Sequence, residues 1–328
     1  MSSSPHTIRF EGTPIPLVSG ETVLDAMLRA GIDASYSCRS GACQTCLLRA
    51  TSGSLTPASQ RGLRDSLKRS GYFLACVCRP VDDMEISAQP PDDDVRARIA
   101  NVERLASDVV LVTVETRAPF EYQAGQYVVL IRPDGLKRSY SITNVPGDAR
   151  LEFHVKLMPG GRMSQWLIEP ETIGAEVVVR GPAGECYHRA NEPNYSLLLA
   201  GTGTGLGPLY GIACEAIRSG HKAPIHVFHA AGDAEGLYMH SRLSSLAAEV
   251  GNLHYHPVTR RDSGQPGFLS GNLEPLLVSQ IEDVKSCRVY LCGNPDFVRA
   301  ARRNLFQAGT PSTRIHADAF LTTAANAQ

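Results

Sequence analysis

The sequence predicts a multi-domain chain with a small α+β domain, an antiparallel β-barrel and an α/β domain built on a parallel sheet. The pattern of expected elements changes along the chain, from a hairpin and helix, through short strands with Gly and Pro turns, to strands alternating with helices. A length of 328 residues also suggests two or three domains. We place the domains at residues 1–88, 96–190 and 191–328, with a linker over residues 89–95.

The first domain is expected to begin with a hairpin. Thr7–Phe10 and residues 15–18 alternate around a Glu-Gly-Thr turn. A helix is expected from Thr22, with Gly31 where it ends. The linker after this domain combines prolines with a run of aspartates, so we expect it to be extended and solvated.

The other two domains differ in the order of their elements. In the second, β-branched or alternating runs predict strands over residues 109–115, 127–131 and 151–157. In the third, strands are expected over residues 195–200, 225–230, 253–258 and 288–292, and helices over residues 209–218, 241–250 and 296–308. Strands that alternate with helices imply a parallel sheet with helices on both faces.

Composition and charge exclude several classes of protein. With 43% hydrophobic and 20% charged residues, the chain is expected to be globular rather than disordered. Lys+Arg 32 against Asp+Glu 33 predicts no nucleic-acid partner. No apolar stretch approaches the ~20 residues of a membrane helix and no signal peptide is visible, so we expect no membrane span and a cytoplasmic protein. Nine cysteines in such a chain indicate ligands and core thiols rather than disulfides.

A cysteine cluster carries the first chemical signal. Cys38, Cys43 and Cys46 have the spacing C-x4-C-x2-C, and Cys76 stands alone further along, as in plant-type [2Fe–2S] sites. Thiolates bind iron, and backbone N–H groups of so short a loop can point at the sulfur atoms. The main alternative is structural zinc, which usually takes two short cysteine pairs. We expect these four cysteines to be the ligands, and four others to be free or packed thiols: Cys78, Cys186, Cys214 and Cys287.

Residues 36–46 and 74–80 resemble a plant-type ferredoxin domain. The resemblance implies a β-grasp-type α+β fold for the first domain. It also implies that an acceptor protein docks near the cluster loop, with Arg39 and the residues around Cys78 as candidates. Plain solvent exposure is the alternative interpretation of those residues.

The second domain contains a flavin signature. Residues Arg138, Ser139, Tyr140 and Ser141 resemble the R-x-Y-S motif of the ferredoxin–NAD(P)+ reductase superfamily. In that family the Arg contacts flavin phosphate, the Tyr packs along the isoalloxazine and the Ser hydrogen-bonds near N5. The residue types suit these roles, because a guanidinium forks onto phosphate and a Tyr ring supplies a flat apolar surface. An ordinary strand edge could carry the same four residues.

A second segment supports the flavin interpretation. Residues 160–164 precede a short helical stretch and resemble the family's second phosphate-binding segment, where free N–H groups favour an anion. A plain turn is the alternative. The family resemblance implies FAD rather than FMN. The cofactor-binding candidates in this segment are Gly161, Arg162, Met163 and Ser164.

Two motifs in the third domain point to a nicotinamide nucleotide. A glycine-rich loop follows one expected strand and opens a helix, where a backbone can approach a pyrophosphate closely. Its candidates are Gly201, Thr202, Gly203, Thr204 and Gly205. Residues 292–295 resemble the superfamily's C-G-x-P motif, which places Cys292 near the nicotinamide and the flavin edge and adds Gly293 as a contact. A buried strand thiol before a helix-opening Pro is the alternative.

The remaining candidates concern the flavin edge and the choice of donor. Asp318 and Phe320 resemble an acidic residue and a C-terminal aromatic that approach the flavin in this family, although a last strand with a packed Phe fits equally. Asp233, together with Glu235, favours the free ribose 2′-OH of NADH. Arg260 and its neighbour Arg261 could instead bind the 2′-phosphate of NADPH.

The whole chain resembles the three-domain reductase components of multicomponent oxygenases, both Rieske dioxygenases and diiron monooxygenases. The resemblance implies electron flow from NADH to FAD to [2Fe–2S] to a separate terminal oxygenase or its ferredoxin, with Tyr140, Ser141 and Cys292 at the reaction site. We expect a monomer. The alternatives are a reductase for sugar deoxygenation, a ferredoxin-like carrier with a non-functional flavin domain, and a zinc-stabilised interaction protein.

Overall fold

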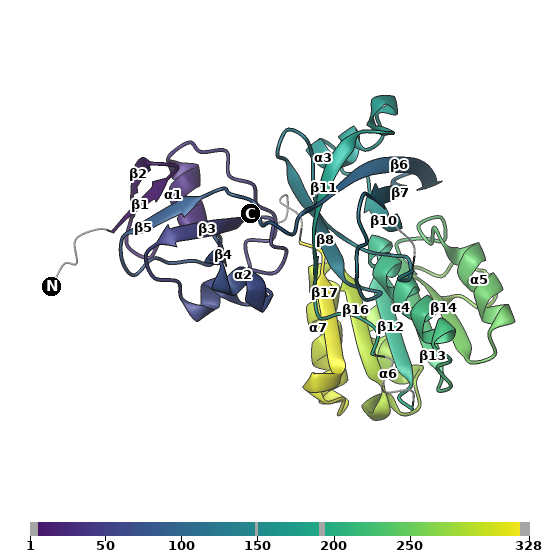
Figure 1. Ribbon diagram of the computed structural model, residues 1–328. Helices are drawn as coiled ribbons and strands as arrows, with labels where there is room; N and C mark the ends of the chain where they lie inside the picture. Colours follow the sequence, from purple (N-terminus) through teal and green to yellow (C-terminus); the bar gives the residue numbers. More distant parts are fainter. Residues whose placement is uncertain (1–5, 148–149, 190–193, 322–328) are drawn as a thin grey trace.

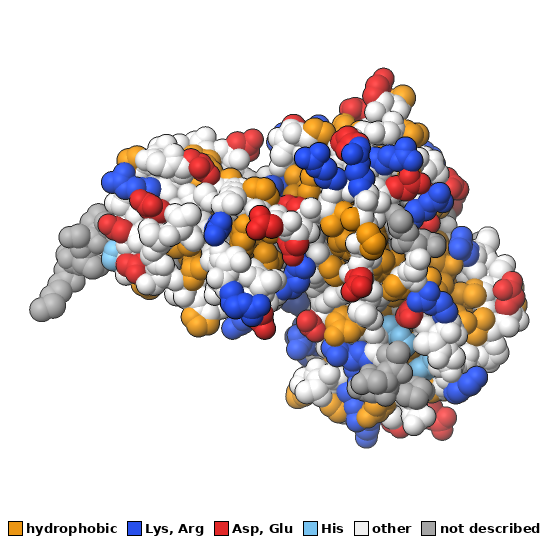
Figure 2. Space-filling model, viewed as in Figure 1, with side chains coloured by type: hydrophobic (Ala, Val, Ile, Leu, Met, Phe, Trp, Pro, Cys, Tyr) orange, Lys and Arg blue, Asp and Glu red, His pale blue; other side chains and the backbone are white. Residues whose placement is uncertain are grey.

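A computed structural model describes residues 6–147, 150–189 and 194–321 (Figure 1). Three separate sheets form, one in each expected domain, so the predicted multi-domain fold class is confirmed. The N-terminal domain lies beside the other two, which pack on each other (Figure 1). Acidic and basic side chains both occur over all three domains on the face drawn in Figure 2. Within the described part of the chain, no helix has the length and apolar character needed to cross a membrane.

The N-terminal domain is an α+β fold with a five-stranded sheet in the order β2-β1-β5-β3-β4. Its elements are β1 (Thr7–Phe10), β2 (Thr13–Pro16), α1 (Val23–Arg29), β3 (Leu47–Ser52), α2 (Asp65–Arg69), β4 (Tyr72–Leu74) and β5 (Met84–Ser87). The hairpin partner is β2 rather than residues 15–18, because Glu11 and Gly12 both adopt left-handed φ angles of 47° and 83° and form a two-residue turn. The Oγ1 atom of Thr22 accepts from the Asp25 N–H at 3.2 Å and caps α1 as predicted.

The second domain is the predicted antiparallel barrel, with strands in the order β10-β7-β6-β11-β8-β9. Its elements are β6 (Val95–Ala106), β7 (Val109–Thr116), β8 (Tyr127–Ile131), β9 (Lys137–Ser141), β10 (Arg150–Lys156), α3 (Arg162–Trp166) and β11 (Glu176–Ala183). The Thr143 N–H, just after β9, donates to the Glu152 carbonyl on β10 at 2.9 Å. The two outer strands of the sheet therefore meet, and the sheet curls into a barrel around one apolar core.

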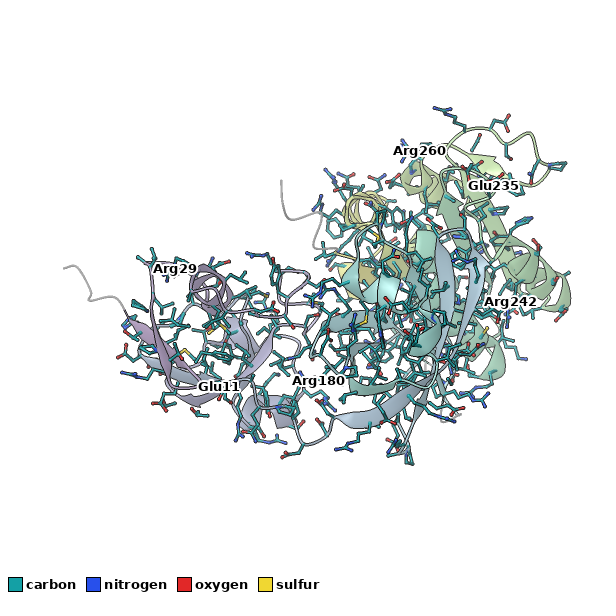
Figure 3. All side chains as sticks on the ribbon, turned by 90° about the horizontal axis from the view of Figure 1, so that it is seen from above. Glu11, Arg29, Arg180, Glu235, Arg242 and Arg260 are labelled. Atoms are coloured by element: carbon teal, nitrogen blue, oxygen red, sulfur yellow. The ribbon has the colours of Figure 1, made fainter. Side chains whose placement is uncertain are left out.

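The linker differs from the expectation of a solvated segment. Pro91 is buried, and β6 already begins at Val95. The guanidinium of Arg180 on β11 forms a bidentate ion pair with Asp94, at 2.9 and 2.7 Å, and the two side chains are only 4% and 10% exposed. Figure 3 shows Arg180 where the N-terminal domain meets the barrel. Two charges removed from water need such a paired geometry, so the second half of the linker is fixed to the barrel.

The third domain has an all-parallel sheet in the order β15-β14-β13-β12-β16-β17. Its elements are β12 (Leu197–Thr202), α4 (Leu206–Arg218), β13 (Ile225–Ala231), α5 (His240–Glu249), β14 (Leu253–Thr259), β15 (Leu269–Ser270), α6 (Leu273–Ser279), β16 (Arg288–Gly293), α7 (Pro295–Gln307) and β17 (Ile315–Ala319). Helices α4 and α5 pack on one face and α6 and α7 on the other, as predicted. The chain builds outward from β12 in one direction and then restarts at β16 beside it, so β12 and β16 flank the topological switch point. The expected boundary between residues 190 and 191 lies outside the described residues.

Candidate functional site

The cysteine loop between α1 and β3 is tightly wound. Arg39, Gly41 and Gln44 have left-handed φ angles of 51°, 77° and 57°. For Arg and Gln this region is uncommon, and such conformations cluster at functional sites because surrounding structure must hold them there. The turns aim backbone donors inward: the N–H groups of Ser40 and Cys43 each lie 3.4 Å from the Cys38 sulfur. These donors favour a thiolate at Cys38.

The four predicted ligands come together. The thiols of Cys43 and Cys76 hydrogen-bond to Cys38 and lower the pKa of Cys38, and Cys76 likewise lowers the pKa of Cys46. The described His, Cys, Asp and Glu side chains include no group of three or more arranged around a single metal ion. Four neighbouring thiols fit the donor set of a two-iron cluster, which shares them between its irons. Cys78 is fully buried in the domain core, and burial raises its pKa to about 11.

The cluster loop contacts the flavin-type strand β9 directly. The Ser139 hydroxyl donates to the Cys43 carbonyl at 2.9 Å, and its oxygen lies 3.3 Å from the Thr45 hydroxyl. Next to it, the Tyr127 hydroxyl on β8 donates to the carbonyl of Ala42. Two successive carbonyls of the cluster loop are therefore held by hydroxyls of the barrel.

Strand β9 carries the flavin motif at the edge of the barrel sheet. All five of its residues are half-buried, so its side chains keep exposed surface along the whole strand. Arg138 and Tyr140 share one face by strand alternation. The Tyr140 ring lies 6.1 Å from the Phe153 ring, and burial raises the pKa of its hydroxyl. A guanidinium and a flat ring on a partly open edge strand fit a flavin.

The second flavin segment forms α3, with Gly161 directly before the helix. Met163 and Ser164 are buried, and the Ser164 hydroxyl lies 3.1 Å from the Met158 N–H, which donates to it. Arg132 was not expected: it donates to the Arg162 carbonyl at 3.0 Å. Its guanidinium also lies 4.7 Å from the centroid of the Trp166 ring. Arg132 thus ties the end of β8 to α3, a contact that no motif in the sequence signals.

The two nucleotide motifs meet at the carboxyl ends of β12 and β16. A Cβ on Gly205 would lie 2.4 Å from the Cys292 carbonyl oxygen and 2.7 Å from the Gly293 Cα, so only glycine lets the loops approach this closely. The Thr202 hydroxyl accepts from the Asn294 N–H at 2.9 Å and ties the loops together. In open parallel sheets, ligands bind outside the strand ends at the switch point, which is where these motifs lie.

The barrel and the nucleotide domain share a partly buried polar contact. The Ser141 hydroxyl donates to Asp318 at 3.2 Å, and Asp318 pairs with Cys292 across β16 and β17. Burial raises the pKa of Asp318 to about 6, and the bond from Ser141 acts in the opposite direction. Burial raises the pKa of Cys292 well above its ordinary value, and the Cys186 sulfur, 3.7 Å away, adds to this effect. Ser141 and Cys292 therefore share one neighbour, Asp318, whereas the half-buried Tyr140 packs against the barrel core.

Phe320, the aromatic candidate near the C-terminus, is held beside the C-G-x-P motif. The Phe320 N–H donates to the Gly293 carbonyl at 2.8 Å, so the segment after β17 follows the C-G-x-P motif. Phe320 is half-buried. The structure thus brings Asp318 and Phe320 beside the nucleotide motifs.

A histidine pair was missed by the sequence analysis. His154 on β10 lies 2.9 Å from the Tyr238 hydroxyl of the nucleotide domain. The Tyr238 ring also meets His229 edge-on, at 5.4 Å between centroids. Burial lowers the pKa of His154 to about 4 and of His229 to about 3, so both rings are neutral near pH 7. No local pattern links these residues.

The acidic and basic residues expected to select between NADH and NADPH lie in the loops after β13 and β14. Asp233 follows β13, and its carboxylate accepts from the Gly236 N–H at 2.9 Å. The Arg260 N–H donates to the Ala231 carbonyl at 3.2 Å, which joins the loops after β13 and β14. Figure 3 shows Glu235 and Arg260 close to each other at the end of the nucleotide domain.

Comparison with known proteins identifies each domain. Residues 8–81 match a 2Fe-2S iron-sulfur cluster binding domain, residues 96–188 an oxidoreductase FAD-binding domain and residues 199–303 an oxidoreductase NAD-binding domain. These matches agree with the expected [2Fe–2S], FAD and nicotinamide cofactors.

Full-length relatives carry the same three domains. The chain is 30% identical over 309 residues to the ferredoxin–NAD(P)+ reductase component of the naphthalene 1,2-dioxygenase/salicylate 5-hydroxylase systems of a Ralstonia species, covering 92% of this chain and 94% of the relative. It is 29% identical over 331 residues to the xylene/toluene monooxygenase electron transfer component of Pseudomonas putida, covering 96% and 93%. The crystal structure of an Amycolatopsis cytochrome P450 reductase is similar, with 30% identity, a TM-score of 0.67 and coverage of 96% and 98%.

Proposed function

The chain belongs to the electron-transfer reductase components of multicomponent oxygenases, and we propose that it carries electrons from NADH through FAD and its [2Fe–2S] cluster to a separate terminal oxygenase. The acceptor we favour is a Rieske dioxygenase or diiron monooxygenase, or the ferredoxin that serves it. None of the nine cysteines forms a disulfide, which fits a reducing cytoplasm.

One observation supports this order of transfer above all others. Ser139 and Ser141 lie two positions apart on β9, on the same face of the strand. Ser139 contacts the cluster loop at the Cys43 carbonyl, and Ser141 contacts Asp318 in the nucleotide domain. The strand with the flavin motif therefore touches both of the other domains, as a relay between them requires.

Bound FAD supplies the change from two-electron to one-electron chemistry, because it accepts a hydride and passes electrons on singly. We assign the flavin phosphate to Arg138 and the segment Gly161, Arg162, Met163 and Ser164. Hydride transfer needs the reacting atoms about 3–3.5 Å apart, and the glycine loop packed against Cys292 orients the nicotinamide for it. The partly buried contact of Ser141 with Asp318 joins the barrel to the nucleotide domain beside these loops. No general base is needed.

NADH is the donor that the loop after β13 favours. Asp233 and Glu235 offer carboxylates to a ribose hydroxyl, and a carboxylate at this position disfavours a 2′-phosphate. Arg260 lies at the same corner and is the residue that would favour NADPH. The names of the relatives span a dioxygenase, a monooxygenase and a cytochrome P450 reductase, so the acceptor needs its own experiment. A partner in sugar deoxygenation is the alternative acceptor.

An anaerobic titration of the purified protein with NADH, and separately with NADPH, tests the proposal by visible absorbance. Bleaching of the flavin and cluster bands by sub-stoichiometric NADH would support the relay and the donor. A flavin that reduces while the cluster stays oxidised would contradict the relay. A flavin that neither donor reduces would favour the alternative of a carrier with a non-functional flavin domain.

Two matched variants test whether the protein prefers NADH or NADPH. Asp233→Asn keeps an oxygen for the Gly236 N–H and removes only the charge, so it should shift preference toward NADPH by about tenfold. Arg260→Ala is its counterpart and should leave the use of NADH unchanged. A wild-type preference for NADPH that Arg260→Ala abolishes would reverse the assignment.

A further inference from the structure

The hydroxyl groups between the cluster loop and β9 form a short chain of hydrogen bonds. The Ser139 hydroxyl donates to the Cys43 carbonyl at 2.9 Å. The Thr45 hydroxyl lies 3.3 Å from the Ser139 oxygen and also 3.3 Å from the Cys43 sulfur. Thr45 is completely buried, so its hydroxyl is confined to what surrounds it in the interface.

The number of protons on these hydroxyl groups limits which hydrogen bonds they can donate. A serine or threonine hydroxyl has one proton to give and lone pairs with which to accept. The Ser139 hydroxyl donates its proton to the Cys43 carbonyl, so toward Thr45 its oxygen can only accept. As a cluster ligand the Cys43 sulfur carries no proton and can only accept. Thr45 has one proton, and it can direct that proton to the Ser139 oxygen or to the Cys43 sulfur, but not to both.

The direction in which Thr45 donates its proton affects Cys43 as a cluster ligand. A hydrogen bond to a ligand sulfur offsets negative charge, so it stabilises the reduced, more negative cluster and raises its reduction potential. The bond lies in a buried site, where low polarity makes such interactions stronger than in water. The orientation of one hydroxyl, set by a residue of the barrel, can therefore act on the cluster in the neighbouring domain.

We propose that Ser139 is a positioning residue for electron transfer from the flavin to the cluster, and that it sets the cluster potential by competing with the Cys43 sulfur for the Thr45 proton. The proposal rests on the proposed function. One electron arrives at the cluster, no covalent bond forms or breaks, and the Thr45 proton stays on its oxygen while the O–H turns. With the Ser139 oxygen present, the oxidised cluster receives less of the Thr45 bond. On reduction, the greater negative charge on sulfur draws the Thr45 O–H toward Cys43.

The test measures the cluster midpoint potential by a reductive titration of the full holoprotein, followed by electron paramagnetic resonance. Ser139→Ala frees the Thr45 proton for sulfur and should raise the potential. Thr45→Val removes that proton and should lower it. Each shift should reach up to a tenfold change in the one-electron equilibrium, about 59 mV. The double variant should behave as Thr45→Val alone, because Ser139 acts only through Thr45.

The controls separate this idea from the proposed function. Ser141→Ala removes a hydroxyl from the same face of β9 and should leave the cluster potential unchanged. Thr45→Ser keeps the hydroxyl and should keep the wild-type potential, even if Thr45→Val fails to fold. A chemical reductant replaces NADH, so a wild-type protein that does not oxidise NADH would contradict only the proposed function. An unchanged potential in Ser139→Ala, or additive shifts in the double variant, would overturn the proposal.

Discussion

The two contacts that the flavin barrel makes are built differently. Its contact with the nucleotide domain is buried and close. A Cβ added to Gly207 of the nucleotide domain would lie only 2.7 Å from the Thr143 side chain of the barrel. Ser141 meets Asp318 there. Its contact with the N-terminal domain instead uses hydroxyls that hold backbone carbonyls, as at Ser139 and Tyr127.

This difference follows from what crosses each contact. A hydride moves only between atoms about 3–3.5 Å apart, so its two binding loops must be fixed to a fraction of an ångström. An electron can tunnel further and needs no shared bond, so its contact needs a stable orientation rather than close packing. We therefore expect changes at the nucleotide side to affect the rate of flavin reduction, and changes at the cluster side to affect the onward transfer.

Cys76→Ser should give the largest effect and should separate the two contacts completely. Loss of one of the four proposed cluster ligands should remove the cluster absorbance and lower acceptor reduction by more than ~100-fold. This exceeds the 10- to ~100-fold loss typical when a residue that only supports a ligand is removed. Flavin reduction by NADH should continue. Cys78→Ser is the matched control and should keep the cluster, because Cys78 is buried in the core. Loss of the cluster in Cys78→Ser alone would reverse the ligand assignment.

Gly205→Ala should have the opposite pattern. The added methyl group would lie 2.4 Å from the Cys292 carbonyl oxygen and must push the glycine loop away from β16. A displacement of about 1 Å can cost roughly 100-fold in rate, so rapid-mixing kinetics should show flavin reduction slowed by that order. The cluster potential should not change. Gly251→Ala has open space around it and serves as the control; a similar loss there would show a general effect on folding.

Asp318 should make flavin reduction depend on pH. Burial raises its pKa to about 6, so the carboxylate is ionised above that pH and protonated below it. Hydride loss leaves positive charge on the nicotinamide, which the carboxylate stabilises, so the rate should fall about tenfold below pH 6. Asp318→Asn should abolish the inflection, which stopped-flow measurements from pH 5 to 8 would detect. A profile shared by both proteins would exclude Asp318 as its source.

The same shift has a consequence for stability. The folded state holds the Asp318 proton more tightly than the unfolded chain, whose pKa is near 3.8, so this group lowers stability as pH rises from about 4 to about 6. Asp318→Asn should therefore gain about 1–3 kcal/mol over the wild type at pH 7 and nothing at pH 4. Denaturant unfolding at the two pH values would measure the difference, and an equal gain at both would exclude ionisation as the cause.

Tyr238→Phe should have the smallest effect of these variants, and it tests one hydrogen bond between the barrel and the nucleotide domain. It leaves the partly buried His154 nitrogen without its 2.9 Å partner, which costs about 1–2 kcal/mol. We expect a lower unfolding temperature and a modestly raised KM for NADH, with the cluster potential unchanged. Tyr255→Phe is the control, because its hydroxyl is buried without a hydrogen-bond partner among the described residues. Equal losses in both variants would remove any special role for the contact with His154.

Much of this protein could be predicted from the sequence because its strongest signals are local. The spacing of Cys38, Cys43 and Cys46 is imposed by one loop that must wrap one cluster. The run of glycines at 201, 203 and 205 marks a loop between a strand and a helix, and the alternation of strands and helices around it predicts the parallel sheet. Each signal involves neighbours in the chain, so it survives without knowledge of the fold.

The contacts between domains required the tertiary structure. The bonds from Ser139 to Cys43 and from Ser141 to Asp318 join residues 96 and 177 positions apart. Those between Tyr238 and His154 and between Arg180 and Asp94 join residues 84 and 86 positions apart. Single serines, histidines and aspartates carry no pattern of their own, and packing alone determines which of them become partners. The sequence therefore determined which cofactor chemistry the chain supports, whereas only the folded structure decided how the three sites are connected, because that depends on side chains brought together across domains.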